Sequence, residues 1–80
     1  MLTSQKGSVL TVDIHGMRSD DAKRQLSRAG KDVREIVVIH GYSHGQVLKN
    51  MVRLELKHTR IQSRLLSLNE GQTRLLLKER

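Results

Sequence analysis

Two segments of this 80-residue chain share one order of residue types: an apolar stretch, then His and Gly, then a loop and the start of a helix. Their sequences are VDIHGMRSDDA and VVIHGYSHGQV, and the two histidines, His15 and His40, are 25 residues apart. A strand, a helix and a second strand in succession normally form a right-handed crossover between parallel strands. The repeat therefore predicts two parallel strands whose carboxyl ends, with both His-Gly turns, share one edge of a sheet.

The first unit follows a segment that has no apolar periodicity. We therefore expect residues 1–8 to be a flexible tail and residues 9–80 to be a single domain. Apolar and polar residues alternate from residue 10 to residue 15, as in a strand with one buried face. Asp13 and His15 are then neighbours on the polar side of that strand.

A short helix and a second strand are expected next. Ser19 is the expected N-cap of the helix and Gly30 its C-terminal stop. The helix has a narrow apolar stripe, formed by Ala22, Leu26 and Ala29. Residues 36–39 are a continuous β-branched run, typical of a strand that is covered on both sides or placed centrally in a sheet.

The rest of the chain predicts a second helix and a closing hairpin. The helix should extend from Gln46 to about His58, and its apolar side comprises Val47, Leu48, Met51, Val52 and Leu54. Residues 61–68 and 74–78 are expected to be antiparallel strands around the turn 69–72. The element order strand, helix, strand, helix, strand, strand predicts an α/β fold, an α+β two-layer sandwich with a mixed sheet and both helices on one face.

Composition limits the classes of protein further. The chain has no Phe or Trp, so its one thin core must consist of branched aliphatic residues. It has no Cys, which excludes disulfides, thiolate metal sites and thiol nucleophiles. The longest apolar run has four residues, far fewer than the roughly 20 that cross a bilayer. We therefore expect a cytoplasmic protein with no membrane partner.

The charge indicates a polyanionic partner, RNA or DNA. Fifteen Lys and Arg against eight Asp and Glu give a net charge of +7. A basic stripe at every fourth residue of the second helix comprises Lys49, Arg53 and Lys57, and Arg18 lies beside the first His-Gly turn. A charge stripe alone would favour an ordinary solvated helix face, but this stripe adjoins the loop from Gly41 to Gly45, which favours a ligand.

That loop is itself a candidate phosphate site. Its glycines, Gly41 and Gly45, let backbone N–H groups approach a phosphate at the start of the next helix. Tyr42, the only aromatic residue, could stack on an unpaired base or simply fill space over the loop. Ser43 and His44 complete the set of candidate nucleic-acid-binding residues in this loop.

The two motifs resemble the signatures of the Smr (small MutS-related) domain family, also found in MutS2-type proteins. These signatures are a strand ending in DLHG and a later apolar strand ending in HGxGxG; here they are DIHG at residues 13–16 and HGYSHG at residues 40–45. The resemblance covers about residues 9–78. It implies a small two-layer sandwich, nucleic-acid binding and, in several members, endonuclease cleavage of RNA or DNA. Ser43 stands where the family usually has Gly, and Tyr42 where Lys is common.

The resemblance places the family's functional acid and histidines on Asp13, His15 and His40. Phosphodiester hydrolysis needs a base and an acid, and histidine can serve as either at neutral pH. Asp13 could orient His15 through a hydrogen bond, or hold a divalent cation such as Mg²⁺ or Mn²⁺ against the phosphate. The plainer alternatives are an Asp13 that pairs with a nearby Arg, and strand-end histidines bonded to the local backbone.

Three functions from different classes stay open. The first is an endonuclease, a hydrolase that acts through Asp13, His15 and His40. The second is a module that binds nucleic acid without cutting it, which Ser43 favours. The third is a domain that docks on a ribosome or a repair partner. A cleavage assay separates the first two functions, and the salt dependence of binding separates both from the third.

Overall fold

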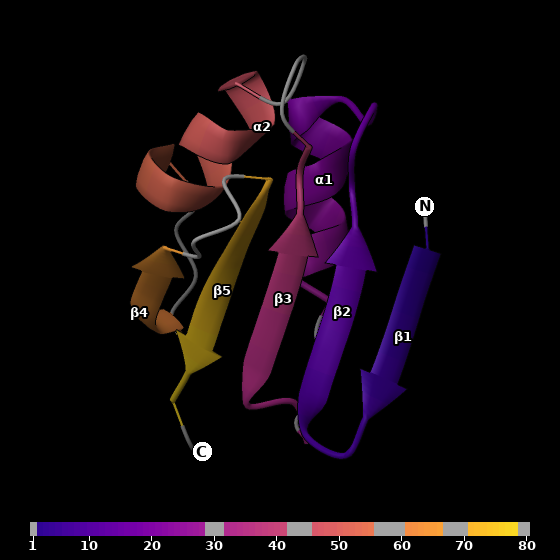
Figure 1. The fold of residues 1–80 in the computed structure, drawn as a ribbon, viewed down its shortest axis with the longest axis vertical. Helices are drawn as coiled ribbons and strands as arrows, with labels where there is room; N and C mark the ends of the chain where they lie inside the picture. The colour runs from indigo at the N-terminus through magenta and orange to yellow at the C-terminus, as the bar shows by residue number, and fades with distance from the viewer. Residues whose placement is uncertain (1, 29–31, 42–45, 56–60, 67–70, 79–80) are drawn as a thin grey trace.

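The structure, a computed structural model, describes residues 2–28, 32–41, 46–55, 61–66 and 71–78. Its elements, in chain order (Figure 1), are β1 (Leu2–Lys6), β2 (Val9–Asp13), α1 (Ser19–Leu26), β3 (Glu35–Ile39), α2 (Gln46–Asn50), the π-helical segment η1 (Met51–Glu55), β4 (Ile61–Leu66) and β5 (Gln72–Leu77). No helix of the described residues is long and apolar enough to cross a membrane.

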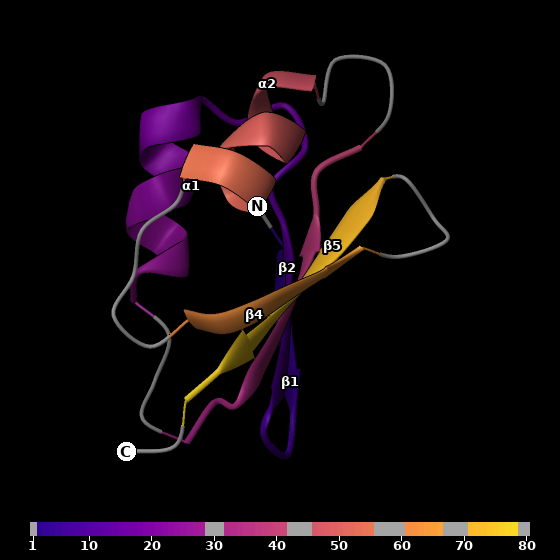
Figure 2. The ribbon, with the colours of Figure 1, turned by 90° about the vertical axis from the view of Figure 1, so that its left-hand side faces the viewer.

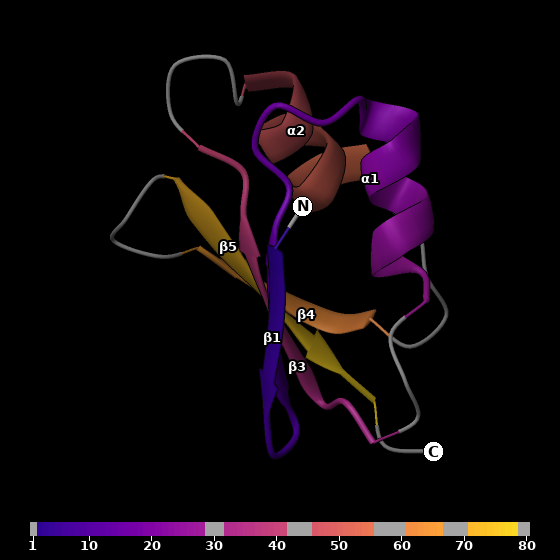
Figure 3. The same ribbon diagram turned by 90° about the vertical axis from the view of Figure 1, so that its right-hand side faces the viewer.

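The strands form one mixed sheet in the order β1-β2-β3-β5-β4. Strands β2 and β3 are parallel, and the other neighbouring pairs are antiparallel. Both helices lie on the same face of this sheet, as the two side views show (Figures 2 and 3). The predicted fold class, an α+β sandwich with a mixed sheet and helices on one face, is confirmed.

The core lies between the sheet and the two helices. In β3 the buried positions alternate, with Ile36 and Val38 toward the helices and their neighbours half-buried on the open face. The central β-branched strand is therefore covered on one side, and its run of four apolar residues reflects its central position. The other fully or nearly buried apolar residues are Val12, Ile14, Ala22, Leu26, Val33, Leu48, Met51, Val52, Leu75 and Leu77.

The expectation of a frayed N-terminal tail was wrong for Leu2–Lys6, which form the edge strand β1. This strand pairs with β2 through a two-residue turn that contains Gly7, whose φ is +59°. From Thr3 to Lys6 its side chains are exposed, so its stability comes from the backbone ladder and from a 2.8 Å hydrogen bond between Gln5 Nε2 and Asp32 Oδ2. A strand held by backbone pairing, with exposed polar side chains, shows no apolar periodicity in its sequence. The sequence therefore did not predict this strand.

The helix boundaries also differ from expectation. Ser19 is the first helical residue, and the N-cap is Arg18, which makes no side-chain capping hydrogen bond. The helix ends at Leu26, while Ala29 and Gly30 lie outside the described residues. The capping preference for Ser thus placed the helix start one residue late.

The buried side of the second helix is narrower than predicted. Leu48, Met51 and Val52 are buried at i, i+3 and i+4, whereas Val47 and Leu54 are 65% and 76% exposed. Val47 and Leu54 lie outside the stripe that faces the sheet. The predicted C-terminal end near residue 58 lies outside the described residues.

The closing hairpin is antiparallel, as predicted, but its second strand begins earlier. β5 starts at Gln72, two residues before the expected position. Thr73 therefore belongs to the sheet, on the same buried face as Leu75 and Leu77.

Candidate functional site

The two His-Gly turns meet at the carboxyl ends of β2 and β3. Asp13 lies opposite Ile39 in the parallel register, and the Ile14 N–H donates to the Ile39 carbonyl at 2.9 Å. Just beyond the strands, a β carbon placed on Gly41 would be 3.4 Å from the β carbon of His15. The prediction that both turns share one edge of the sheet is confirmed.

Both turns depend on a left-handed glycine. Gly16 has a φ of +78° and Gly41 a φ of +85°. After Gly16 the Met17 N–H donates to the Ile14 carbonyl at 3.0 Å, which closes a tight turn directly after β2. A side chain at either glycine would be strained, because L residues rarely adopt these angles.

We expect Gly41→Ala to lower the free energy of unfolding in urea by about 1–2 kcal/mol, the cost of a β carbon at positive φ. Gly7→Ala is the matched control, since its φ is also positive but nothing lies within 4 Å of the added carbon. NMR signals of the His15 ring should move in Gly41→Ala and stay in place in Gly7→Ala. Equal spectra for the two variants would contradict the close approach of Gly41 to His15.

His15 and Asp13 form a pair at the end of β2. Nδ1 of His15 lies 2.5 Å from Asp13 Oδ1, and the same oxygen accepts the His15 backbone N–H at 3.1 Å. The Asp13 side chain is 21% exposed and that of His15 is 69% exposed. Because the carboxylate only accepts, Nδ1 carries the hydrogen, and Nε2 has no partner among the described residues. The ring thus presents Nε2 to solvent.

The hydrogen bond from His15 lowers the pKa of the Asp13 carboxyl, against a smaller opposing effect of partial burial. Asp13 is therefore an anion at neutral pH. An ionised acceptor at Nδ1 fixes the ring's tautomer and orientation. The predicted orienting contact between these two residues is present in the structure.

His40 is in a different environment, although it follows the neighbouring strand. It is 1% exposed, and both ring nitrogens have partners. Nδ1 lies 3.2 Å from the Gly41 carbonyl, and Nε2 lies 2.9 Å from Oγ1 of Thr73. The Thr73 hydroxyl also accepts the Nε–H of Arg53 at 2.8 Å. We name this set of residues, Arg53, Thr73, His40 and Gly41, the His40 network.

The donor and acceptor roles in the His40 network are consistent with a neutral ring. A carbonyl only accepts, so Nδ1 of His40 carries the hydrogen, and Nε2 accepts the Thr73 hydroxyl hydrogen. The backbone N–H groups of His40 and Gly41 both donate to the Gly71 carbonyl, at 2.9 and 3.1 Å. The His40 side chain and the backbone of His40 and Gly41 together hold the second His-Gly turn against Gly71 and the start of β5.

Burial lowers the pKa of His40, and the nearby charges of Arg53 and Lys49 lower it further, against the hydrogen bond to Gly41. Protonation therefore favours the unfolded chain. The stability from neutral His40 is complete above the unfolded pKa of about 6.5 and is lost as the pH falls below it.

We expect the free energy of unfolding to fall as the pH is lowered from about 7 to 5, with a limit near 1.4 kcal/mol per pH unit for one proton. His40→Gln, which cannot take up that proton, should flatten this dependence, measured by urea unfolding at several pH values. Thr73→Ser keeps the hydroxyl and should retain the wild-type slope. If the stability of wild type and of His40→Gln depends on pH in the same way, another group causes the loss of stability at low pH.

The predicted basic stripe is only partly available for a ligand. The Arg53 guanidinium is half-buried, and besides Thr73 it donates from Nη2 to the Gln72 carbonyl at 3.2 Å. Lys49 is half-buried, and Arg18 is exposed next to the first turn. The remaining predicted site residues, Tyr42, Ser43, His44, Gly45 and Lys57, lie outside the described residues.

Thr73 and Gly71 belong to this region and were missed from the sequence. Thr73 is 0% exposed and interrupts an otherwise apolar buried face of β5. If β5 starts at Gln72, the alternation places Thr73 on the same buried face as Leu75 and Leu77. A single buried hydroxyl group on an apolar face needs a hydrogen-bond partner, and this could have indicated a polar contact at Thr73. Gly71 gives no comparable sequence signal, because it takes part through its carbonyl.

Asp13 is the residue that we considered as a ligand of a divalent cation. The described residues contain no group of three or more His, Cys, Asp or Glu side chains that could hold a metal ion. Asp13 is the carboxylate of this site, and its Oδ1 is bonded to His15.

Comparison with known proteins gives one match. The model of the Smr domain family matches residues 12–74, which include both His-Gly turns and most of the sheet. No curated protein and no solved structure matches the chain.

Proposed function

The chain belongs to the Smr domain family, and on that premise we propose that it cleaves phosphodiester bonds in RNA or DNA through Nε2 of His15. At the level of the family, the domain is a nucleic-acid-binding, endonuclease-like module. The observation that supports cleavage is the Asp13–His15 pair. The His15 ring is exposed, and its Nδ1 is bonded to the ionised carboxylate of Asp13.

In this proposal His15 transfers one proton. Neutral Nε2 takes the proton of the attacking hydroxyl or water, or the imidazolium gives its proton to the leaving oxygen as the P–O bond breaks. In-line displacement places the attacking and leaving oxygens on opposite sides of phosphorus, so one ring serves only one of them. Water carries the other proton. Asp13 acts as a positioning residue for the ring.

We assign His40 a positioning role in place of the expected catalytic one. Both of its ring nitrogens are engaged inside the His40 network, and burial favours its neutral form. It supports Gly41, which approaches His15 across the sheet edge.

The second candidate function is binding of RNA or DNA without cleavage. Ser43 in place of the family's usual Gly favours it, as does the engagement of both His40 nitrogens, which leaves a single free imidazole nitrogen at this sheet edge among the described residues. In this case the pair Asp13–His15 would contact a phosphate without transferring a proton.

The deciding experiment incubates the purified chain with labelled single-stranded and duplex RNA and DNA, in Mg²⁺, in Mn²⁺ and in EDTA. Cleavage products that depend on His15 support the nuclease. Salt-dependent binding with every substrate intact would contradict it and leave the binding module. Absence of binding to all four substrates at low salt would contradict both functions.

A further inference from the structure

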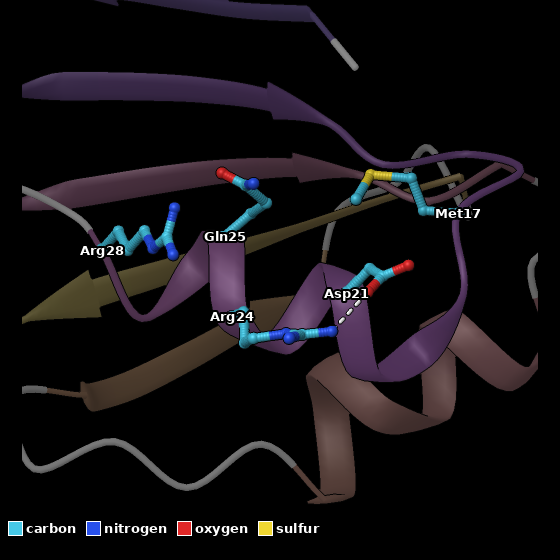
Figure 4. Close-up of a pocket in the computed structure, with 5 residues that line it drawn as sticks. All are labelled: Met17, Asp21, Arg24, Gln25 and Arg28. Atoms are coloured by element: carbon cyan, nitrogen blue, oxygen red, sulfur yellow. Dashed lines mark hydrogen bonds and ion pairs between the residues drawn. The ribbon is translucent and has the colours of Figure 1, made fainter.

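A shallow polar groove lies along α1, and its lining does not include Asp13 or His15. It has a volume of about 420 Å³ and is lined by Met17, Asp21, Arg24, Gln25 and Arg28 (Figure 4). Successive members of this set are adjacent or three or four residues apart, from the turn before α1 to the turn after it. A single short segment therefore builds the whole groove.

The groove begins where the first His-Gly turn ends. Met17 directly follows Gly16, and its N–H closes the turn onto the Ile14 carbonyl. The Met17 side chain packs partly against the core, which fixes this end of the groove. The groove therefore starts two residues after His15 along the chain.

The charges in the groove are unbalanced in favour of an anion. Arg24 Nη2 lies 2.6 Å from Asp21 Oδ1, and both side chains are exposed, at 69% and 51%. Arg28 is also exposed, and its guanidinium has no partner among the described residues. The groove thus contains one carboxylate and two guanidinium groups, and its surplus charge is positive.

The other side chains suit a nucleotide better than a free inorganic anion. Gln25 offers an amide that can both donate to and accept from a base edge. The thioether of Met17 is a favourable neighbour for an aromatic ring. Guanidinium groups bind phosphate oxygens through paired hydrogen bonds. The set of Met, Gln and two Arg matches the base and phosphate of one nucleotide.

We propose that the α1 groove is a second nucleotide-binding subsite, which holds a nucleotide that flanks the phosphodiester bound at His15. This inference rests on the proposed binding of RNA or DNA and does not require cleavage. It moves the main electrostatic contact from the expected stripe on the second helix, where Arg53 is used within the protein, to α1. Asp21 weakens the subsite by pairing with Arg24.

The first test compares two double variants that remove the same charge. The first double variant, Arg24→Gln with Arg28→Gln, removes the cations of the groove. The control, Lys6→Gln with Lys78→Gln, removes two exposed cations at the sheet edge opposite the His-Gly turns, and neither residue lines the groove. Binding of a labelled single-stranded oligonucleotide is measured over a range of salt. The slope of log K against log salt should flatten by about 0.7 for each phosphate that the groove variant no longer neutralises, and by less in the control.

The second test has the opposite sign. Asp21→Asn frees Arg24 and should tighten binding by about 1.5- to 5-fold, the equivalent of an exposed ion pair. Asp20→Asn is the control, because Asp20 is exposed in the same helical turn and does not line the groove. Circular dichroism confirms that each variant is folded.

The outcomes separate this inference from the proposed function. If wild type binds with a steep salt dependence and the two double variants behave alike, the groove is not a subsite while nucleic-acid binding stands. Equal affinities for Asp21→Asn and Asp20→Asn would also overturn the groove. If wild type binds no nucleic acid, the proposed function fails and the groove inference fails with it.

Discussion

His15→Ala should slow phosphodiester cleavage by about 10²- to 10⁴-fold, the usual contribution of a general acid or base. Affinity for the same substrate should change little, because the ring is one exposed group in a basic protein and its removal abolishes proton transfer rather than the positive field. Single-turnover rates at saturating protein, together with binding constants from the same oligonucleotide, measure the two effects separately.

Asp13→Asn tests the orienting part of that pair. An amide can present an N–H to Nδ1 and so favour the wrong tautomer of His15, which slows proton transfer while the fold and the binding surface persist.

For His15→Ala, the control for removal of a histidine is His58→Ala, and His58 lies outside the described residues. Equal cleavage by wild type and His15→Ala would point to a contaminating nuclease or to another base.

Thr73→Val should lower the free energy of unfolding by about 1–3 kcal/mol, the cost of leaving a buried polar group without its partner. The change keeps the side chain's shape but removes the oxygen that links Arg53 Nε to His40 Nε2. Arg53 is half-buried and can reach water, whereas His40 is 1% exposed and cannot. The largest part of the destabilisation is therefore assigned to His40.

Thr11→Val is the matched control for that substitution. Thr11 lies in β2 on the face away from the helices and is half-buried, and no hydrogen bond of its side chain is seen in the described residues. Urea unfolding of both variants gives the comparison, and ¹⁵N NMR of the imidazole reports the tautomer of His40. Equal stability of the two variants would contradict the His40 network as a stabilising unit.

Local features of the fold and site followed directly from the sequence. Alternation in β2 placed Val12 and Ile14 inward and put Asp13 and His15 on neighbouring polar positions, since side-chain direction in a strand depends on the residue's own position. The repeated His-Gly pair predicted that both turns share one sheet edge, because parallel strands joined by a helix bring their carboxyl ends together.

The tertiary structure alone decided what His40 does. Both histidines stand between Ile and Gly, but His40 is buried and faces Thr73, which comes from a strand 33 residues later and also bonds Arg53. Antiparallel register between β3 and β5 sets that contact, and no local pattern encodes it. β1 likewise depends on backbone pairing with β2. Side-chain periodicity is local and can be predicted from a sequence, whereas a partner across the sheet is determined only when the strands pair.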